Sequence, residues 1–568
     1  MKWKAMSTAT LLCVSAIGLS GCLADAPNVP VEGDPPKERT QGSDESTTSP
    51  TVSGQDVNIE LYGDIDPDLT QEAGSDNPAL LLDDSDVSYA GAGMTATESD
   101  SGSAVQSLAA SADFQKQIAD ISGRVKTALE NDGASVSELV NRVVQGPTGE
   151  VASLVYDVSY ESAGTTKSSG ELRNLLIGEL GSDANVAELP SGTADQAEFR
   201  VALALVATPD QALTWVSAFP VANAGDVSSR YGALNNGTAI VPAGTSRNLT
   251  KGQNEFEQSA SASNAVDILW VIDNSGSMGE EQENLGAGVD QFFTKLNSAG
   301  VDYRLAATTT DGSTCESLRS LPADDTKTFI TPDTPNAAAQ WSQDNPTTGI
   351  ARPGTSGSPN ETGFYCADRV DRSTFDREGA ADITVFVSDE EENETSDEDQ
   401  PSGQSGYTVR DYNTYEQRFV ERGDTFFAIV GEHDQIKRTA DDSYGDTNAT
   451  ECNGEGGEAE GGSHYREVAR VTGGSASSIC SKASSWSVMY DEIIETATGL
   501  ASRFTLDRSV LPSSVEVDVN GQSVARDPSR QNGFDVILLE DGARIAFYGD
   551  ALPENGDAIT VTYDYVPE

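Results

Sequence analysis

The most informative pattern in the chain is the apolar run Val266–Ile272, which carries one acid near its start and lacks the alternation of a half-buried strand. Such a run is typical of a strand in the centre of a parallel sheet that helices cover on both faces. The run stops at Asp273, and Ser275 and Ser277 follow at alternate positions. Ligands of such sheets bind beyond the carboxyl ends of the strands, so these three residues are expected at a binding edge.

Strand and helix patterns alternate from residue 264 to residue 504, which predicts an α/β domain with a doubly wound, mostly parallel sheet. A second buried strand, Asp382–Val387, ends at Ser388-Asp389, so a second acid is expected at a carboxyl end. Further strands are expected at Tyr303–Ala307, Thr328–Ile330 and Thr425–Val430, and helices at Glu280–Ser298, Ala337–Gln343, Thr362–Val370, Tyr412–Arg422, Tyr465–Val471 and Trp486–Leu500.

The flanking segments show weaker patterns. Residues 104–263 are expected to form an α+β domain without a chemical motif, with a helical face over Ala104–Asn131 and a helix at Glu171–Leu180. Its strands are expected at Val151–Tyr160 and Phe199–Ala207, with extended pieces at Tyr231–Val241 and Asn254–Phe256. Residues 505–568 alternate between apolar and polar positions around Asn-Gly and Asp-Gly turns, which predicts a small antiparallel β domain. Because so small a domain is hard to stabilise alone, it is expected to pack on the α/β domain.

The residues after the first strand suit a metal ion. A hard cation such as Mg²⁺ takes oxygen ligands, and Asp273, Ser275 and Ser277 offer a carboxylate and two hydroxyls on one loop. The sequence DNSGSM after an apolar strand resembles the Asp-x-Ser-x-Ser metal-ion-dependent adhesion site of von Willebrand factor type A (VWA) domains, and the resemblance covers about residues 266–504. The competing interpretation is an Asx-type turn that caps the next helix.

The resemblance implies the rest of the site. Asp389 is the counterpart of the acid that closes the family's site from the fourth strand. The family adds a threonine from the loop before a central helix, and Thr362 is the best match, although the spacing is imperfect and Glu361 could stand there instead. Mg²⁺ is the favoured ion, whereas a glutamate would add charge and could favour Ca²⁺. In the family a protein partner offers a carboxylate to the open coordination position, and the same role is implied here.

The N-terminus has the pattern of an export signal. Two lysines precede an apolar segment around Leu11–Leu19 that is too short to span a bilayer. The following Leu-Ser-Gly-Cys resembles the bacterial lipobox, which implies removal of residues 1–21 and lipidation of Cys22. We therefore expect a protein of the bacterial envelope, anchored by lipid alone, with the outer membrane favoured because Leu23 follows the cysteine. Residues 22–103 are poor in apolar residues and are expected to form a disordered acidic tether.

The cysteines fit an oxidising compartment. Cys13 belongs to the signal and Cys22 to the anchor, which leaves an even set: Cys315, Cys366, Cys452 and Cys480. Three connectivities are possible. We favour Cys315 with Cys366 and Cys452 with Cys480, because each pair joins loops or ends near one side of the fold and closes a loop of manageable length. Zinc is the competing use, but no C-x₂-C pair exists.

Charge and missing motifs narrow the function. Ninety-two acidic against 35 basic residues give a formal net charge of -57, which argues against nucleic acid and anionic lipid as direct partners. The acidic runs after Asp389 and over residues 441–460 are expected to be solvated loops, with a second cation site as the alternative. No H-E-x-x-H, G-x-S-x-G or Walker pattern occurs, and His464 is expected on the surface. We therefore expect no enzyme but a metal-dependent protein-binding module for adhesion or assembly; the alternatives are an envelope enzyme or enzyme subunit with a Lewis-acid ion, and a structural spacer.

Overall fold

The computed structural model describes residues 46–565 with gaps. The largest segments outside the described residues are 1–45, 98–113, 181–194, 393–411 and 433–451. The described residues all belong to one compact unit, Glu45–Glu568. The predicted signal peptide and Cys22 lie outside them. Among the described helices, none combines the length and apolar composition that a membrane span requires.

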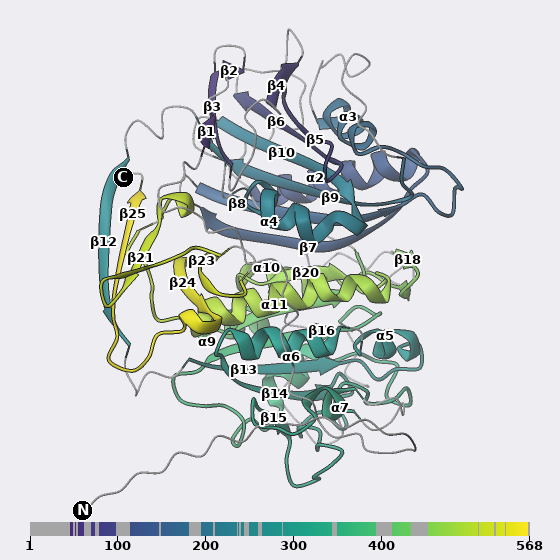
Figure 1. Ribbon diagram of the computed structural model, residues 1–568. Coiled ribbons are helices and arrows are strands. Elements are labelled where there is room, and N and C mark those ends of the chain that lie inside the picture. Colours follow the sequence, from purple (N-terminus) through teal and green to yellow (C-terminus); the bar gives the residue numbers. More distant parts are fainter. Residues whose placement is uncertain are drawn as a thin grey trace, which may run out of the picture. The chain divides into compact units, whose positions relative to one another are not determined.

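A run of six strands carries the first buried strand at its centre, in the order β15-β14-β13-β16-β17-β20 (Figure 1). Neighbours pair in parallel except for the short β15, which is antiparallel to β14. In chain order this is 3-2-1-4-5-6, the order of a doubly wound fold, so the predicted mixed α/β class is confirmed. The strands are β13 (Ala265–Ile272), β14 (Asp302–Thr309), β15 (Phe329–Ile330), β16 (Ala381–Val387), β17 (Thr425–Val430) and β20 (Ser475–Ser478).

Both faces of this sheet are covered, as the unbroken apolar run of β13 predicts. Ile268 and Trp270 belong to a core with helices α6 and α11, whereas Leu269 and Val271 belong to a second core with α8, α9 and α10. The expected helix Glu280–Ser298 is instead two helices, because Gly288 takes a left-handed conformation with φ of 72° between them. The helices are α5 (Gly279–Asn284), α6 (Val289–Ser298), α7 (Ala337–Trp341), α8 (Gly363–Arg369), α9 (Tyr412–Arg422), α10 (Ser463–Val471) and α11 (Trp486–Ala501).

The preceding α+β segment does not form a separate sheet. Strand β7 pairs antiparallel with β20, and the sheet continues through an antiparallel series to give thirteen strands (Figure 1). The added strands are β7 (Ser135–Gly146), β8 (Gly149–Ser159), β9 (Glu198–Ala207), β10 (Gln211–Pro220), β6 (Tyr89–Thr97), β5 (Ala79–Asp84) and β4 (Thr70–Ala73). Helices α2 (Phe114–Asn131), α3 (Ser169–Leu180) and α4 (Ala224–Asn235) pack on this part. Residues 231–235, expected to be extended, belong to α4.

The expected tether over residues 22–103 is wrong for its last part. Strands β5 and β6 carry fully buried residues such as Leu81 and Ala92. Small residues take the place of large apolar ones in β6 because Trp215 of β10 lies against it: a Cβ on Gly91 would lie 2.7 Å from the indole ring. The chain before them contains β1 (Ser46–Thr48), β2 (Thr51–Val52) and β3 (Gln55–Leu61), and β3 pairs with β11 (Ile240–Pro242).

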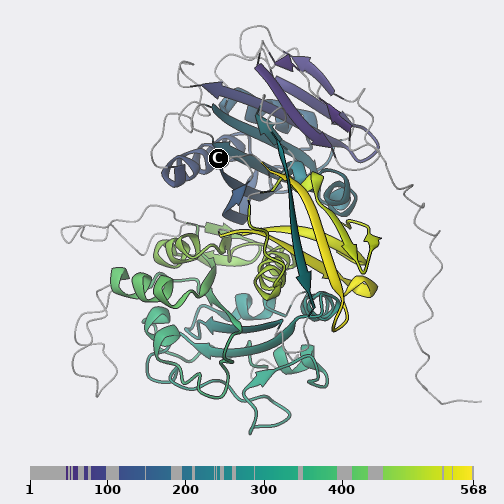
Figure 2. The same cartoon turned by 90° about the vertical axis from the view of Figure 1, so that its left-hand side faces the viewer.

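The C-terminal β region borrows a strand from earlier in the chain. Strand β12 (Thr250–Glu257) pairs with β25 (Ala558–Tyr565), beside which Figure 2 shows it running. The sheet continues with β21 (Glu516–Val519) and β22 (Gln522–Val524). The hairpin of β23 (Gly533–Leu539) and β24 (Gly542–Tyr548) places Ile537 and Leu539 in the same core as α11. The predicted small β domain is therefore joined to the α/β part through a shared core.

Candidate metal centre

The loop after β13 has the conformation that an oxygen-lined site requires. Asp273 is fully buried, and its Oδ1 accepts a hydrogen bond from the backbone N–H of Ser275 (2.7 Å). Its Oδ2 accepts one from the hydroxyl of Ser388 (2.6 Å), at the end of β16. The hydroxyls of Ser275 and Ser277 lie 3.1 Å apart. An Asx-type turn is thus present, but helix α5 begins after Met278 without a side-chain cap, so the turn does not cap that helix.

Asp389 joins this group from the next strand. Burial raises the pKa of Asp389, and its side chain lies close enough to those of Ser277 and Asp273 for them to oppose this rise. Burial and the nearby charge of Asp389 also raise the pKa of Asp273, to about 6. The Oδ1 atom of Asp389 is buried and has no hydrogen-bond partner among the described residues. The carboxyl ends of β13 and β16 therefore bring together Asp273, Ser275, Ser277 and Asp389. This is the switch point at which doubly wound sheets bind ligands.

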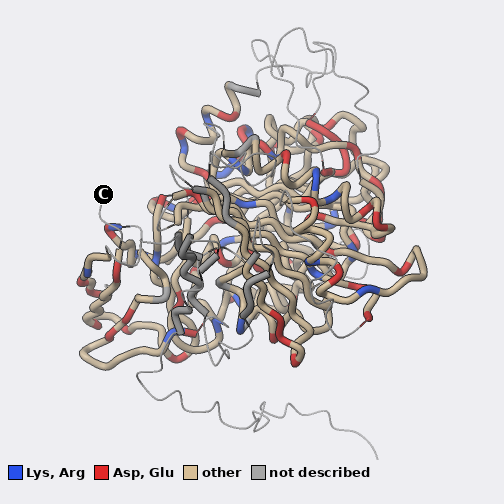
Figure 3. Tube along the Cα trace, turned by 90° about the horizontal axis from the view of Figure 1, so that it is seen from above, with Lys and Arg blue, Asp and Glu red and all other residues tan. Residues whose placement is uncertain are grey.

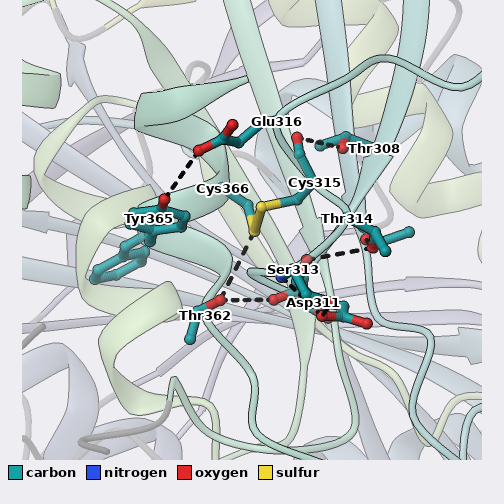
Figure 4. Close-up of a disulfide and its surroundings, with 12 residues drawn as sticks. Thr308, Asp311, Ser313, Thr314, Cys315, Glu316, Thr362, Tyr365 and Cys366 are labelled. Atoms are coloured by element: carbon teal, nitrogen blue, oxygen red, sulfur yellow. Dashed lines mark hydrogen bonds between the residues drawn. A yellow bond between two sulfur atoms is a disulfide. The ribbon is translucent and has the colours of Figure 1, made fainter. Parts of the chain in front are cut away.

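The side chain of Thr362 is engaged by its neighbours. Its hydroxyl donates a hydrogen bond to the backbone carbonyl of Thr310 (2.8 Å), and its oxygen lies 3.8 Å from Sγ of Cys366 (Figure 4). Glu361 is fully buried, and one carboxylate oxygen accepts a hydrogen bond from the Thr310 hydroxyl. Its other oxygen, Oε1, has no partner within the described part of the chain. Burial, followed by the charge of Asp273, raises the pKa of Glu361 to about 10.

Two further acids lie in this region: Glu281, which the sequence did not single out, and Glu390, the first residue of the acidic run after Asp389. Glu281 on α5 is 3% exposed, and burial together with Asp389 and other nearby carboxylates raises its pKa to about 7. Burial and the charges of Asp273 and Asp389 raise the pKa of Glu390 to about 7 as well. The sequence signal for Glu281 is its place in the first helical turn after DNSGSM, but a first-turn acid is also common on exposed helices. So many carboxyls with raised pKa values indicate a region that a cation would stabilise.

The acids immediately after Asp389 are not a solvated loop. Both oxygens of Glu391 accept backbone N–H groups at the start of α10, from Ser463 (2.7 Å) and His464 (3.2 Å). Glu392 accepts the backbone N–H of Phe364 (3.2 Å) at the start of α8 and the hydroxyl of Tyr465 (2.7 Å). The expectation fails because helix N-termini supply donors that the sequence pattern does not reveal.

His464 is also buried, at 6% exposure, and the expectation of a surface histidine is wrong. The acids of residues 393–411 and 441–451 lie outside the described residues.

The two disulfides have the favoured pairing. Cys315 is bonded to Cys366, 51 residues later, and Cys452 to Cys480, 28 residues later. The first ties α8 to the loop after β14, next to Thr362 (Figure 4). The second holds the hairpin of β18 (Cys452–Gly454) and β19 (Gly457–Ala459), beyond which the N–H of Glu460 bonds the Asp389 carbonyl (2.8 Å). Each disulfide thus fixes a segment beside the candidate site.

A different acidic trio lies at the opposite, amino-terminal edge of the sheet. Asp267, Asp376 and Asp382 each place a carboxylate oxygen within 4.8 Å of the others and could hold a cation. However, Arg377 already pairs with Asp267 at 2.6 Å, which neutralises the buried member. Within the described residues, Asp273, Asp389 and Glu361 do not form such a close trio.

The residues at the carboxyl edge fit a hard divalent cation by their chemistry. They offer carboxylates and hydroxyls, and unpartnered buried carboxylate oxygens of Asp389 and Glu361 remain. Buried polar atoms are normally hydrogen-bonded, so such oxygens require an explanation such as an ion. Ser277 is exposed, which leaves the site accessible from solvent.

Comparisons with known proteins give little further information. No protein family matches the sequence, and no curated protein does. Among solved structures, the chain is similar to the pilus adhesin SpaC from Lactobacillus rhamnosus GG in its open conformation, with 12% identity and a TM-score of 0.27. The match covers 56% of this chain and 41% of SpaC, so the chain spans less than half of that protein. At this TM-score the likeness carries no argument about function.

Proposed function

We propose that this chain is a cation-dependent protein-binding module of the VWA type, used for adhesion or assembly. The observation that carries the proposal is the meeting of Asp273, Ser275, Ser277 and Asp389 at the switch point of a doubly wound sheet. Asp273 and Asp389 neutralise much of the ion's charge, the serines add neutral ligands, and the solvent side at Ser277 admits a partner's carboxylate. Mg²⁺ or Ca²⁺ is the cation.

We also propose that the module belongs to a lipoprotein of the bacterial envelope that is anchored in the outer membrane. The lipobox-like sequence before Cys22 supports this proposal, and the two disulfides suit an oxidising compartment. Metabolic labelling with a radioactive fatty acid should mark the chain, and Cys22→Ala should abolish the label. A labelled Cys22→Ala variant would contradict the anchor.

The second candidate is an envelope enzyme in which the ion acts as a Lewis acid. The buried acids with raised pKa values favour it, because such groups are frequent in catalytic sites. Ion-dependent turnover of a panel of chromogenic esters and phosphates, abolished by Asp273→Ala, would decide for the enzyme. Ion-dependent capture of a protein from envelope extracts, released by EDTA and lost in the same variant, would decide for the binding module.

The first prediction concerns the ion itself. Binding to the folded state alone stabilises it by about 2.7 kcal/mol at a hundredfold excess of ligand over Kd. We therefore expect Ca²⁺ or Mg²⁺ to raise the midpoint of thermal unfolding of the full chain. General screening also stabilises so acidic a protein, so the comparison is made at matched, high ionic strength.

A double variant separates coordination from screening. Ser275→Ala with Ser277→Ala removes two oxygen ligands without changing the net charge, and it should gain much less from the ion. A control pair, Ser298→Ala with Ser487→Ala, removes half-buried hydroxyls on α6 and α11 that each bond a carbonyl three residues earlier, and it should gain as much as the parent. Equal gains in the parent and the Ser275/Ser277 variant would refute the proposed site.

A further inference from the structure

The fifth ligand of the proposed site is the point at which this chain departs from the VWA pattern. Two oxygen-bearing residues, Glu361 and Thr362, precede helix α8. The Thr362 hydroxyl is engaged with the Thr310 carbonyl and lies on the side of the Cys315–Cys366 disulfide (Figure 4). The hydroxyl hydrogen of Thr362 is therefore already used by a backbone carbonyl.

Glu361, the preceding residue, is also bonded to Thr310, but through the side chain of Thr310. Its Oε2 accepts the hydroxyl of Thr310, whose backbone N–H bonds the carbonyl of Ile272 (3.3 Å), the residue before Asp273. This places the carboxylate beside the carboxyl end of β13. The residue has no exposed surface, and Oε1 has no hydrogen-bond partner among the described residues. A buried, unpartnered carboxylate is costly unless a cation compensates it.

We propose that Glu361, and not Thr362, is the fifth protein ligand of this site and its third carboxylate, and that it makes the site prefer Ca²⁺ to Mg²⁺. The inference rests on the proposed function and specifies its ion. Three carboxylates and two hydroxyls suit Ca²⁺, which takes six to eight oxygens in flexible geometry at about 2.3–2.6 Å, and they leave positions free for a partner. Mg²⁺ requires near-octahedral geometry at about 2.0–2.1 Å.

The spacing of the acids also favours the larger ion. Oxygens of Asp273, Asp389 and Glu361 do not all lie within 4.8 Å of one another in the described structure, so the loops must close on the ion. Two ligands of one Ca²⁺ can lie up to about 5 Å apart, against about 4 Å for Mg²⁺, so Ca²⁺ requires the smaller movement.

The experiment is isothermal titration of the full chain, stripped with EDTA, with CaCl₂ and separately with MgCl₂ at matched ionic strength. The parent should bind Ca²⁺ at least about tenfold more tightly than Mg²⁺. Glu361→Gln should lower the affinity for Ca²⁺ by at least about tenfold and remove most of the preference for Ca²⁺ over Mg²⁺, because glutamine keeps the shape of the side chain and loses its charge. Thr362→Val, the matched control, should leave both affinities within about threefold.

The outcomes separate this inference from the proposal beneath it. Unchanged Ca²⁺ affinity in Glu361→Gln, or loss of Ca²⁺ binding in Thr362→Val with a normal circular dichroism spectrum, overturns the role of Glu361 and leaves the site in place. Absence of any cation binding in the parent overturns both. If Glu361→Gln does not fold, Glu361→Asp replaces it, because this variant keeps the charge on a shorter side chain. It should lower the affinity for Ca²⁺ by more than about twofold, and a smaller change overturns the role of Glu361.

Discussion

Buried acids in this chain accept hydrogen bonds from helix N-termini as well as from arginine side chains. Glu391 accepts the Ser463 and His464 N–H groups and the Ser463 hydroxyl (2.5 Å) at the start of α10. These N–H groups have no partner within the helix itself, and a carboxylate there is favoured by the helix dipole. A single residue thus ties the loop that follows Asp389 to α10.

Glu391→Ala should lower the free energy of unfolding by about 1–2 kcal/mol, the cost of losing an N-terminal cap in a partly buried setting. Urea denaturation of the full chain, followed by circular dichroism, measures the change. Glu421→Ala, in the exposed last turn of α9, is the control and should change stability by less than about 0.5 kcal/mol. Equal effects of the two substitutions would show that the cap does not stabilise the fold.

Asp382 gives a prediction about pH. Its pKa is raised from 3.8 to about 7, mainly by burial and then by the nearby charges of Asp424, Asp376 and Asp267. The charge of Arg372 opposes this rise. Since the folded-state value lies above the unfolded one, this group's contribution to stability is complete below pH 3.8 and is lost as the pH rises through about 7. Asp382→Asn should therefore raise the thermal midpoint at pH 8 and have a smaller effect at pH 5, as measured by calorimetry. A larger gain at pH 5 would contradict this sign.

Asp273 and Asp389 could be placed at one sheet edge from the sequence because each stands at, or one residue after, the end of a recognisable strand. Asp273 and Asp389 follow apolar runs, so their meeting follows from strand order alone. The choice between Glu361 and Thr362 depends on a long loop and its contacts with Thr310, which no local pattern encodes. Glu281 was missed because a sequence does not tell which first-turn acid faces inward.

Secondary-structure elements were predictable where their burial is uniform. Strands β13 and β17 are buried throughout, and their ranges were predicted within one residue. Strand β7 was missed because Glu138 and Arg142 interrupt its apolar positions. Both are buried, and partners from distant elements compensate them: Arg466 lies 2.6 Å from Glu138, and the Leu538 carbonyl accepts from Arg142 at 2.9 Å. Such long-range compensation cannot be read from a local pattern.

The disulfide at α8 is the element that holds the Glu361 loop. Replacing Cys315 and Cys366 together by Ala should cost roughly 2–4 kcal/mol of stability, because a closed loop restricts the unfolded chain. Cys452→Ala with Cys480→Ala should cost a similar amount. The first pair alone lies beside Glu361 and should also weaken Ca²⁺ binding. Urea denaturation and calcium titration of both variants test this, and equal loss of calcium affinity in the two would contradict the special role of the first.

At the scale of the whole molecule, acidic side chains are dispersed, whereas a few arginine side chains connect different regions of the chain. Figure 3 shows Asp and Glu spread over many loops and helices of the described chain. Arg142 of β7 lies 3.5 Å from both Glu492 and Glu495 of α11, and Arg530 of the C-terminal β region lies 2.7 Å from Glu495. One charge network therefore connects the three regions that the sequence suggested as separate domains.

This connection predicts cooperative unfolding of the described regions. The sheet is continuous across β20 and β7, and the core of α11 includes residues of β7 and of the β23–β24 hairpin, so no region can unfold without exposing the core of another. Calorimetry of the full chain should show one transition.

Arg142→Met leaves Glu492 without its close arginine. It should lower the free energy of unfolding for this single transition by about 3 kcal/mol, the lower end for breaking a buried pair. Lys295→Met breaks an exposed pair with Asp491 and should cost less than about 1 kcal/mol. Two resolved transitions, of which Arg142→Met lowers only one, would show that the shared sheet and network do not couple the regions.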